Sequence, residues 1–163
     1  MTADIVVEEL TFEGFFRTNY APLVRSLSVA CGPERAADAV QEAFVQANLR
    51  WRQVADMDVP AAWVRRVAVN RLIDESRRDK RGEDAMTRMS AASVMELAPA
   101  DIDLADAVGM LPQKQRLAVC LFYLLDLPID EVATLLNSTP GTVKSNLYDA
   151  RKRLARHLGG SDD

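Results

Sequence analysis

Residues 128–151 read PIDEVATLLNSTPGTVKSNLYDAR, and this stretch decides which fold we expect. It begins as a short helix in which small Ala133 suits the close crossing of a second helix. Asn137-Ser138 then turns the chain, and Thr139 can cap a second helix whose first residue is Pro140. The stretch therefore predicts a helix-turn-helix.

The second helix of this motif separates an inward stripe from exposed polar faces. Val143, Leu147, Ala150 and Leu154 recur at helical spacing and form the stripe. Polar residues near the start of an exposed helix suit base reading in the major groove, and basic residues further along suit phosphate contacts. The candidate DNA-facing residues are Thr142, Lys144, Ser145, Asn146, Tyr148, Arg151 and Lys152. A helical hairpin packed for structure alone is the alternative.

The rest of the chain also has helical periodicity, without a sustained alternation typical of strands. We expect an all-α fold of two small helical domains, at 1–81 and 101–163, joined by an acidic linker at 82–100. The expected helices span residues 12–30, 34–54 and 60–80 in the first domain and 101–109, 112–125, 128–136 and 140–158 in the second. Each of the last three begins with proline, which is favoured in a first helical turn.

The first three helices each have a stripe predicted to be buried. These stripes consist of Phe12, Phe16, Tyr20, Leu23 and Leu27; of Ala36, Val40, Phe44, Ala47 and Trp51; and of Ala61, Val64, Ala68 and Leu72. Most arginines of the third helix are expected to point elsewhere.

Charge is unevenly distributed along this chain of net charge −4. Residues 64–81 hold seven basic and three acidic side chains, and residues 140–158 hold five basic and one acidic. Residues 82–110, between them, hold one basic and six acidic. Two basic segments could contact phosphate at two places, although each could also be a solvated helix face.

Several classes of function are disfavoured. The longest apolar run, Leu117 to Leu125, is too short to cross a bilayer, and the first residues do not read as a secretory signal, so we expect a cytoplasmic protein without membrane contact. Cys31 and Cys120 are expected to be buried thiols rather than a redox pair. With His157 as the one histidine, no Cys/His metal cluster can form, and no Gly-rich phosphate loop is present. We expect neither enzyme, cofactor nor metal.

Three further motifs give the chain a family resemblance. Residues 38–44 read DAVQEAF, residues 63–78 read WVRRVAVNRLIDESRR, and residues 111–116 read LPQKQR. Together with the helix-turn-helix, in this order, they resemble the extracytoplasmic-function (ECF) sigma factors of the sigma-70 family, over about residues 12–158. The resemblance implies a chain that binds core RNA polymerase, recognises promoter DNA and helps to open it, the chemistry remaining with the polymerase.

The resemblance also implies roles for individual residues. In family terms the first domain is region 2 and the second is region 4. The core-polymerase-binding residues would be Asp38, Gln41 and Glu42, and the minus-ten DNA-binding residues would be Asn70, Asp74, Arg77 and Arg78. The loop 54–60 would hold a flipped base, and the helix-turn-helix would read the minus-thirty-five element. Asp149 departs from the basic residue expected at its position. Family analogy adds an anti-sigma factor as a further partner.

Two other functions remain open from the residues alone. A stand-alone helix-turn-helix regulator would use its first domain for dimerisation or ligand sensing, and it would bind an operator without polymerase. A protein-binding adaptor would not need Lys144 or the basic residues 151–153.

Overall fold

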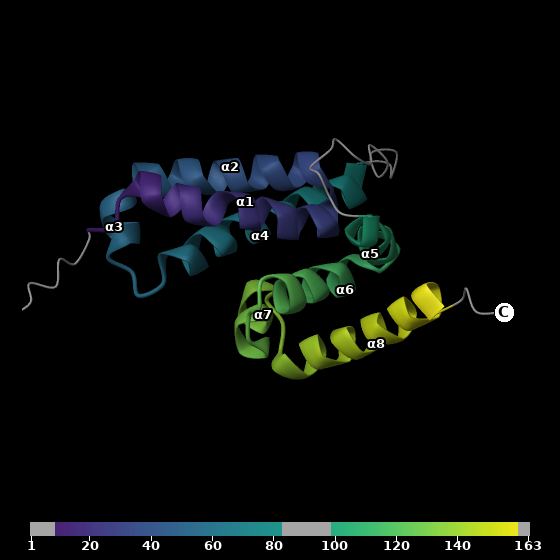
Figure 1. Ribbon diagram of the computed structural model, residues 1–163. Helices are drawn as coiled ribbons and strands as arrows, with labels where there is room; N and C mark the ends of the chain where they lie inside the picture. Colours follow the sequence, from purple (N-terminus) through teal and green to yellow (C-terminus); the bar gives the residue numbers. More distant parts are fainter. Residues whose placement is uncertain (1–8, 83–98, 160–163) are drawn as a thin grey trace, which may run out of the picture.

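The computed structural model describes residues 9–82 and 99–159, which are all-helical, as predicted. The first group of helices comprises α1 (Phe12–Cys31), α2 (Pro33–Leu49), α3 (Trp51–Ala55) and α4 (Pro60–Gly82). The second comprises α5 (Pro99–Gly109), α6 (Gln113–Val119), the π-helical turn η2 (Cys120–Leu124), α7 (Ile129–Leu135) and α8 (Pro140–Gly159). Figure 1 shows α1, α2 and α4 as one layer, with α6, α7 and α8 below it and α5 at one end.

Helix α2 lies at the centre of the first group, packed against both α1 and α4. Its predicted inward residues Ala36, Val40, Phe44 and Ala47 are all buried. Small side chains allow helix axes to approach closely, and Phe44 fills the remaining space as the centre of an aromatic cluster. The rings of α1 that pack around Phe44 belong to Phe12, Phe15, Phe16 and Tyr20.

The prediction for α1 was wrong about which phenylalanine is most buried. Phe15 is 4% exposed, whereas Phe16, predicted to point inward, is 36% exposed. Phe16 lies at the rim, where its ring meets Phe44 edge-on at 5.1 Å and stacks on Tyr20 at 4.6 Å. Phe16 shares the helical phase of Leu23 and Leu27, but Phe15 is the ring that packs against Trp51 of α3, with 5.3 Å between ring centres. Spacing within α1 does not reveal that contact.

The single helix predicted at 34–54 is interrupted at Arg50, whose backbone leaves helical geometry at φ −116° and ψ 25°. Trp51 begins α3 instead of ending the stripe of α2, and its ring lies 5.5 Å from Phe12 and 5.3 Å from Phe15. No glycine or proline marks this break. The indole ring is held by tertiary packing against α1, and the chain bends to place it there.

The helix-turn-helix is present as predicted. Asn137 takes a left-handed conformation (φ 50°), and the Ser138 amide donates to the Ala133 carbonyl at 2.8 Å, which ends α7. Thr139 then caps α8, since its Oγ1 accepts from the Thr142 amide at 3.2 Å. The inward residues Val143, Leu147 and Ala150 are buried, as is Ala133.

Two of the three helix starts predicted at proline need correction. Pro112 and Pro128 have extended backbones, with ψ of 149° and 153°, and therefore cap α6 and α7 from outside. Of these three prolines, only Pro140 is the first residue of its helix. The helix predicted at 112–125 changes from α6 into η2 after Val119.

The predicted linker at 82–100 lies mostly at 83–98, outside the described residues, and its last two residues belong to α5. Cys31 is half-buried, Cys120 is fully buried, and neither forms a disulfide. Within the described residues, no helix has the length and apolar character needed to span a membrane.

The close crossing at Ala133 gives a stability prediction. Replacing Ala133 by leucine should lower the free energy of unfolding by about 1–3 kcal/mol, because the added atoms overpack the α7–α8 contact. The matched control is Thr134→Leu, at the next and exposed position of α7. Urea denaturation measures the free energy of unfolding of both variants. Equal values would contradict a close crossing of α7 and α8 at Ala133.

Candidate nucleic-acid and partner interfaces

Helix α4 presents one polar face to solvent. The four residues predicted to contact minus-ten DNA, Asn70, Asp74, Arg77 and Arg78, are all exposed, and their spacing of four, three and one places them on one side of a helix. Arg66, four residues before Asn70, is also exposed on this side. Sequence reasoning did not include Arg66, although helical spacing from Asn70 identifies it.

Two other arginines of α4 are held by carboxylates. Arg71 Nε donates to Glu75 Oε1 at 3.1 Å, and its Nη1 lies 3.7 Å from Glu42 Oε2 on α2. Arg65 Nη2 donates to Glu131 Oε1 on α7 at 2.9 Å. These pairs set Arg65 and Arg71 apart from the exposed stripe. Arg66, Arg77 and Arg78 are exposed, which agrees with the prediction that most arginines of this helix point away from the core.

The exposed surface of α8 is broader than one face. Of the seven predicted DNA-facing residues, Asn146 is half-buried and the other six are exposed. By helical geometry, Lys144 and Arg151 flank the buried stripe on one side, and Thr142, Ser145 and Asn146 lie on the other. Asp149, also exposed, falls among the second set.

Two cations of α8 are ordered by aromatic residues. Lys152 Nζ lies 4.6 Å from the centre of the Tyr148 ring, which is a cation–π contact between residues one helical turn apart. Arg151 Nη1 donates to the Tyr123 hydroxyl of η2 at 3.0 Å. Both cations are exposed, so each remains able to meet a phosphate.

Helix α2 turns a mixed face outward. Asp38 and Gln41 are exposed, and Glu42 is half-buried because it accepts from Gln46 Nε2 at 3.1 Å and lies beside Arg71. Val45 and Leu49 continue the same face and are 53% and 74% exposed. Sequence reasoning missed these two apolar residues, although their distances of seven and eleven from Asp38 place them on its side of the helix.

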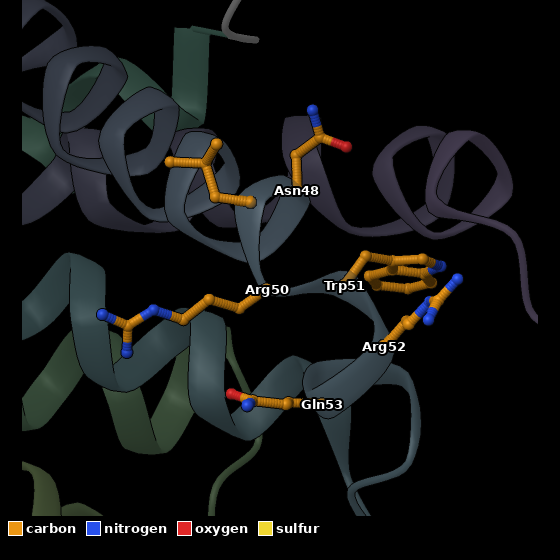
Figure 2. Close-up of a pocket in the computed structure, with 6 residues that line it drawn as sticks. Asn48, Arg50, Trp51, Arg52 and Gln53 are labelled. Carbon is orange, nitrogen blue, oxygen red and sulfur yellow. The ribbon is translucent and has the colours of Figure 1, made fainter.

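An open hollow of about 580 Å³ lies at the junction of α2 and α3. Figure 2 shows Arg52 beside the Trp51 ring and Arg50 extending the opposite way, with Asn48 and Gln53 around them. Both arginines are exposed. The residues that line the hollow come shortly before the loop 56–59 in the sequence. This loop belongs to the segment 54–60, which was predicted to hold a flipped base. Among the described residues, no group of three or more His, Cys, Asp or Glu side chains could hold a metal ion.

Comparison with known proteins identifies both halves of the chain. Residues 9–82 match the family model described as Sigma-70 region 2, and residues 101–154 match Sigma-70, region 4. The chain is 33% identical to the RNA polymerase sigma-E factor of Streptomyces avermitilis over 95% of this chain and 89% of that protein. It is 30% identical to the ECF RNA polymerase sigma factor SigM of Mycobacterium tuberculosis, over 98% of this chain and 83% of the relative.

The fold is also that of a solved sigma factor. The structure of RpoE from Bartonella quintana, determined with the anti-sigma factor NepR, matches with a TM-score of 0.73 at 22% identity, over 93% of this chain and 98% of that one. Because the similarity to sigma factors covers nearly the whole chain, it does not favour the alternative that the protein is a stand-alone helix-turn-helix regulator. The chain therefore belongs to the ECF sigma factors of the sigma-70 family, which bind core RNA polymerase and recognise promoter DNA.

Proposed function

We propose that three exposed helix faces of this sigma factor divide polymerase binding and promoter recognition among them. The face of α2 docks on core RNA polymerase, the polar face of α4 contacts the minus-ten element during strand opening, and α7 with α8 reads the minus-thirty-five element. The α4 face carries the proposal most strongly, because four polar or charged side chains lie exposed together there.

The chemistry of the α4 face suits an opened strand. Removing a base from the stack costs a few kcal/mol, which a protein recovers through stacking and contacts to the backbone. Arg77 and Arg78 would neutralise phosphates, and the Asn70 amide can both donate to and accept from a base. The hollow at the junction of α2 and α3, with Trp51 and two exposed arginines, offers an aromatic surface and positive charge, which are typical of single-strand binding.

The chemistry of α8 suits duplex DNA. Ser145 and the partly exposed Asn146 lie near its amino end, where a recognition helix meets base edges, and Lys144, Arg151 and Lys152 would grip phosphates. Asp149 lies beside the base-facing set, where its carboxylate could accept from the cytosine amino group and would repel a phosphate.

The α2 face combines acidic, amide and apolar side chains. Asp38, Gln41 and Glu42 would make the polar contacts to polymerase, and exposed Val45 and Leu49 would supply apolar area beside them. Large exposed apolar side chains on one helix face are typical of a protein-binding surface. We include both residues in the docking face.

Regulation by an anti-sigma factor is part of the same proposal, supported by the RpoE structure that contains such a partner. We further propose that the chain acts in the cytoplasm, where its polymerase partner works, and that it performs no catalysis of its own.

The docking face is tested by an Asp38→Ala, Gln41→Ala, Glu42→Ala triple variant. With purified core polymerase, the wild type should initiate at discrete promoter sites, and the variant should lose most of this transcription because it no longer binds core. Glu13→Ala is the control, since Glu13 is an exposed acid on α1. A triple variant that binds core as tightly as the wild type would refute the α2 assignment.

The α4 face is tested by Arg77→Ala with Arg78→Ala. Binding of the holoenzyme to a minus-ten single strand should weaken, and its slope against salt concentration should fall by about 1.4, for two lost phosphate contacts at roughly 0.7 each. Arg17→Ala, at an exposed arginine of α1, should leave the slope unchanged. An unchanged slope in the double variant would mean that Arg77 and Arg78 do not contact the phosphates.

A further inference from the structure

One side of α8 carries a row of polar residues at regular spacing, and the last of them is acidic. Thr142, Ser145, Asn146 and Asp149 stand at positions i, i+3, i+4 and i+7, which share one face of an α-helix. Helices that read bases from the major groove place their contacts at this same spacing. Asp149 therefore belongs to the base-facing set by position, about 4.5 Å beyond Asn146 along the helix axis.

The neighbouring cations leave the Asp149 carboxylate unpaired. Lys152 and Arg153 follow it by three and four residues, which is close enough on a helix to form an ion pair. The Lys152 ammonium instead lies 4.6 Å from the centre of the Tyr148 ring. Within the part of the chain that the structure describes, Asp149 forms no ion pair. Its exposed carboxylate thus keeps its full capacity to accept hydrogen bonds from a ligand.

Asp149 is also the one acidic side chain of α8, which carries five basic ones. The basic residues are all exposed: Lys144, Arg151, Lys152, Arg153 and Arg156. A carboxylate among them repels the phosphates that they attract, so it lowers the affinity of the helix for DNA in general. This cost is offset only on a DNA sequence that presents a hydrogen-bond donor to the carboxylate.

The major-groove edges of the four bases differ in what they present to a carboxylate. Guanine has two acceptors there, and thymine has an acceptor and a methyl group, so neither base can donate to Asp149. Adenine has its amino donor beside an acceptor, which repels a carboxylate oxygen. Cytosine presents its N4 amino group without an acceptor. A carboxylate in the groove therefore favours cytosine over the other three bases.

We propose that Asp149 is a specificity-determining residue, which selects a cytosine at one base pair of the minus-thirty-five element by accepting a hydrogen bond from its N4 amino group. The inference rests on the proposed reading of this element by α8 and adds the base that one position must carry. Selection arises from exclusion as well as attraction, since guanine or thymine at that position would set acceptor atoms against the carboxylate.

The experiment measures transcription by the full-length chain with core polymerase, from a promoter that the wild type uses and in which the minus-thirty-five element is randomised. The wild type should prefer cytosine at one base pair by roughly five- to a hundredfold, the range for a single base contact. Asp149→Ala should reduce that preference to less than about twofold and leave the other positions unchanged. Asp149→Asn should move the preference to adenine, because an amide pairs with adenine N6 and N7.

The matched control is Asp106→Asn, which removes an exposed acid of α5, outside the helix-turn-helix. It should leave the base preferences as they are in the wild type. The change to adenine in Asp149→Asn separates a base contact from lost stability or a lost repelling charge, since neither of these alters the preferred base at one position. Base preferences of Asp149→Ala equal to those of the wild type would overturn the inference. Stronger transcription from every sequence, with the same preferences, would overturn it as well.

The same data distinguish this inference from the proposed function. A wild type without any base preference in the randomised element would refute the reading of that element by α8, and the role of Asp149 with it. If the wild type has preferences and none of them depends on Asp149, the role of Asp149 alone is refuted and the proposed function stands.

Discussion

The close packing of α2 between α1 and α4 is the constraint on which the first half of the molecule depends. Ala36, Ala39, Ala43 and Ala47 are completely buried, and their small volume allows a neighbouring helix on each side. With two sides covered, α2 retains one outward face, the mixed face that begins at Asp38. The same packing fixes which side of α4 remains exposed. One run of alanines thus orients two of the three proposed interfaces.

A tight turn has the corresponding role in the second half. The left-handed residue Asn137 and the bond from Ser138 to Ala133 reverse the chain within a few residues, and the Thr139 cap starts α8 at once. The direction of α8 relative to α7 is therefore set by local backbone geometry together with the buried crossing at Ala133. A recognition helix needs such rigidity, because small angular errors move its far end by several ångströms.

Features encoded locally could be predicted from the sequence, and those that depend on tertiary packing could not. The helix-turn-helix was predicted correctly because its small residue, turn and cap lie within ten positions. The break at Arg50 carries no local signal, since it follows from where the Trp51 ring packs. Phe15 and Phe16 were exchanged because the spacing within α1 does not reveal that Trp51, from α3, packs against Phe15. The predicted interface residues are nearly all exposed, which their roles require, but the Arg65–Glu131 contact joins distant segments and no periodicity reveals it.

The contact between Lys152 and the Tyr148 ring has a consequence for conformational entropy. A free lysine side chain samples many rotamers, and fixing it costs up to about 2 kcal/mol. Attraction to the aromatic ring, worth about 0.5–1 kcal/mol at an exposed site, favours rotamers that hold the ammonium 4.6 Å from the ring centre before any partner arrives. Part of the ordering cost is thus met during folding, so a phosphate meets a cation that has less freedom left to lose.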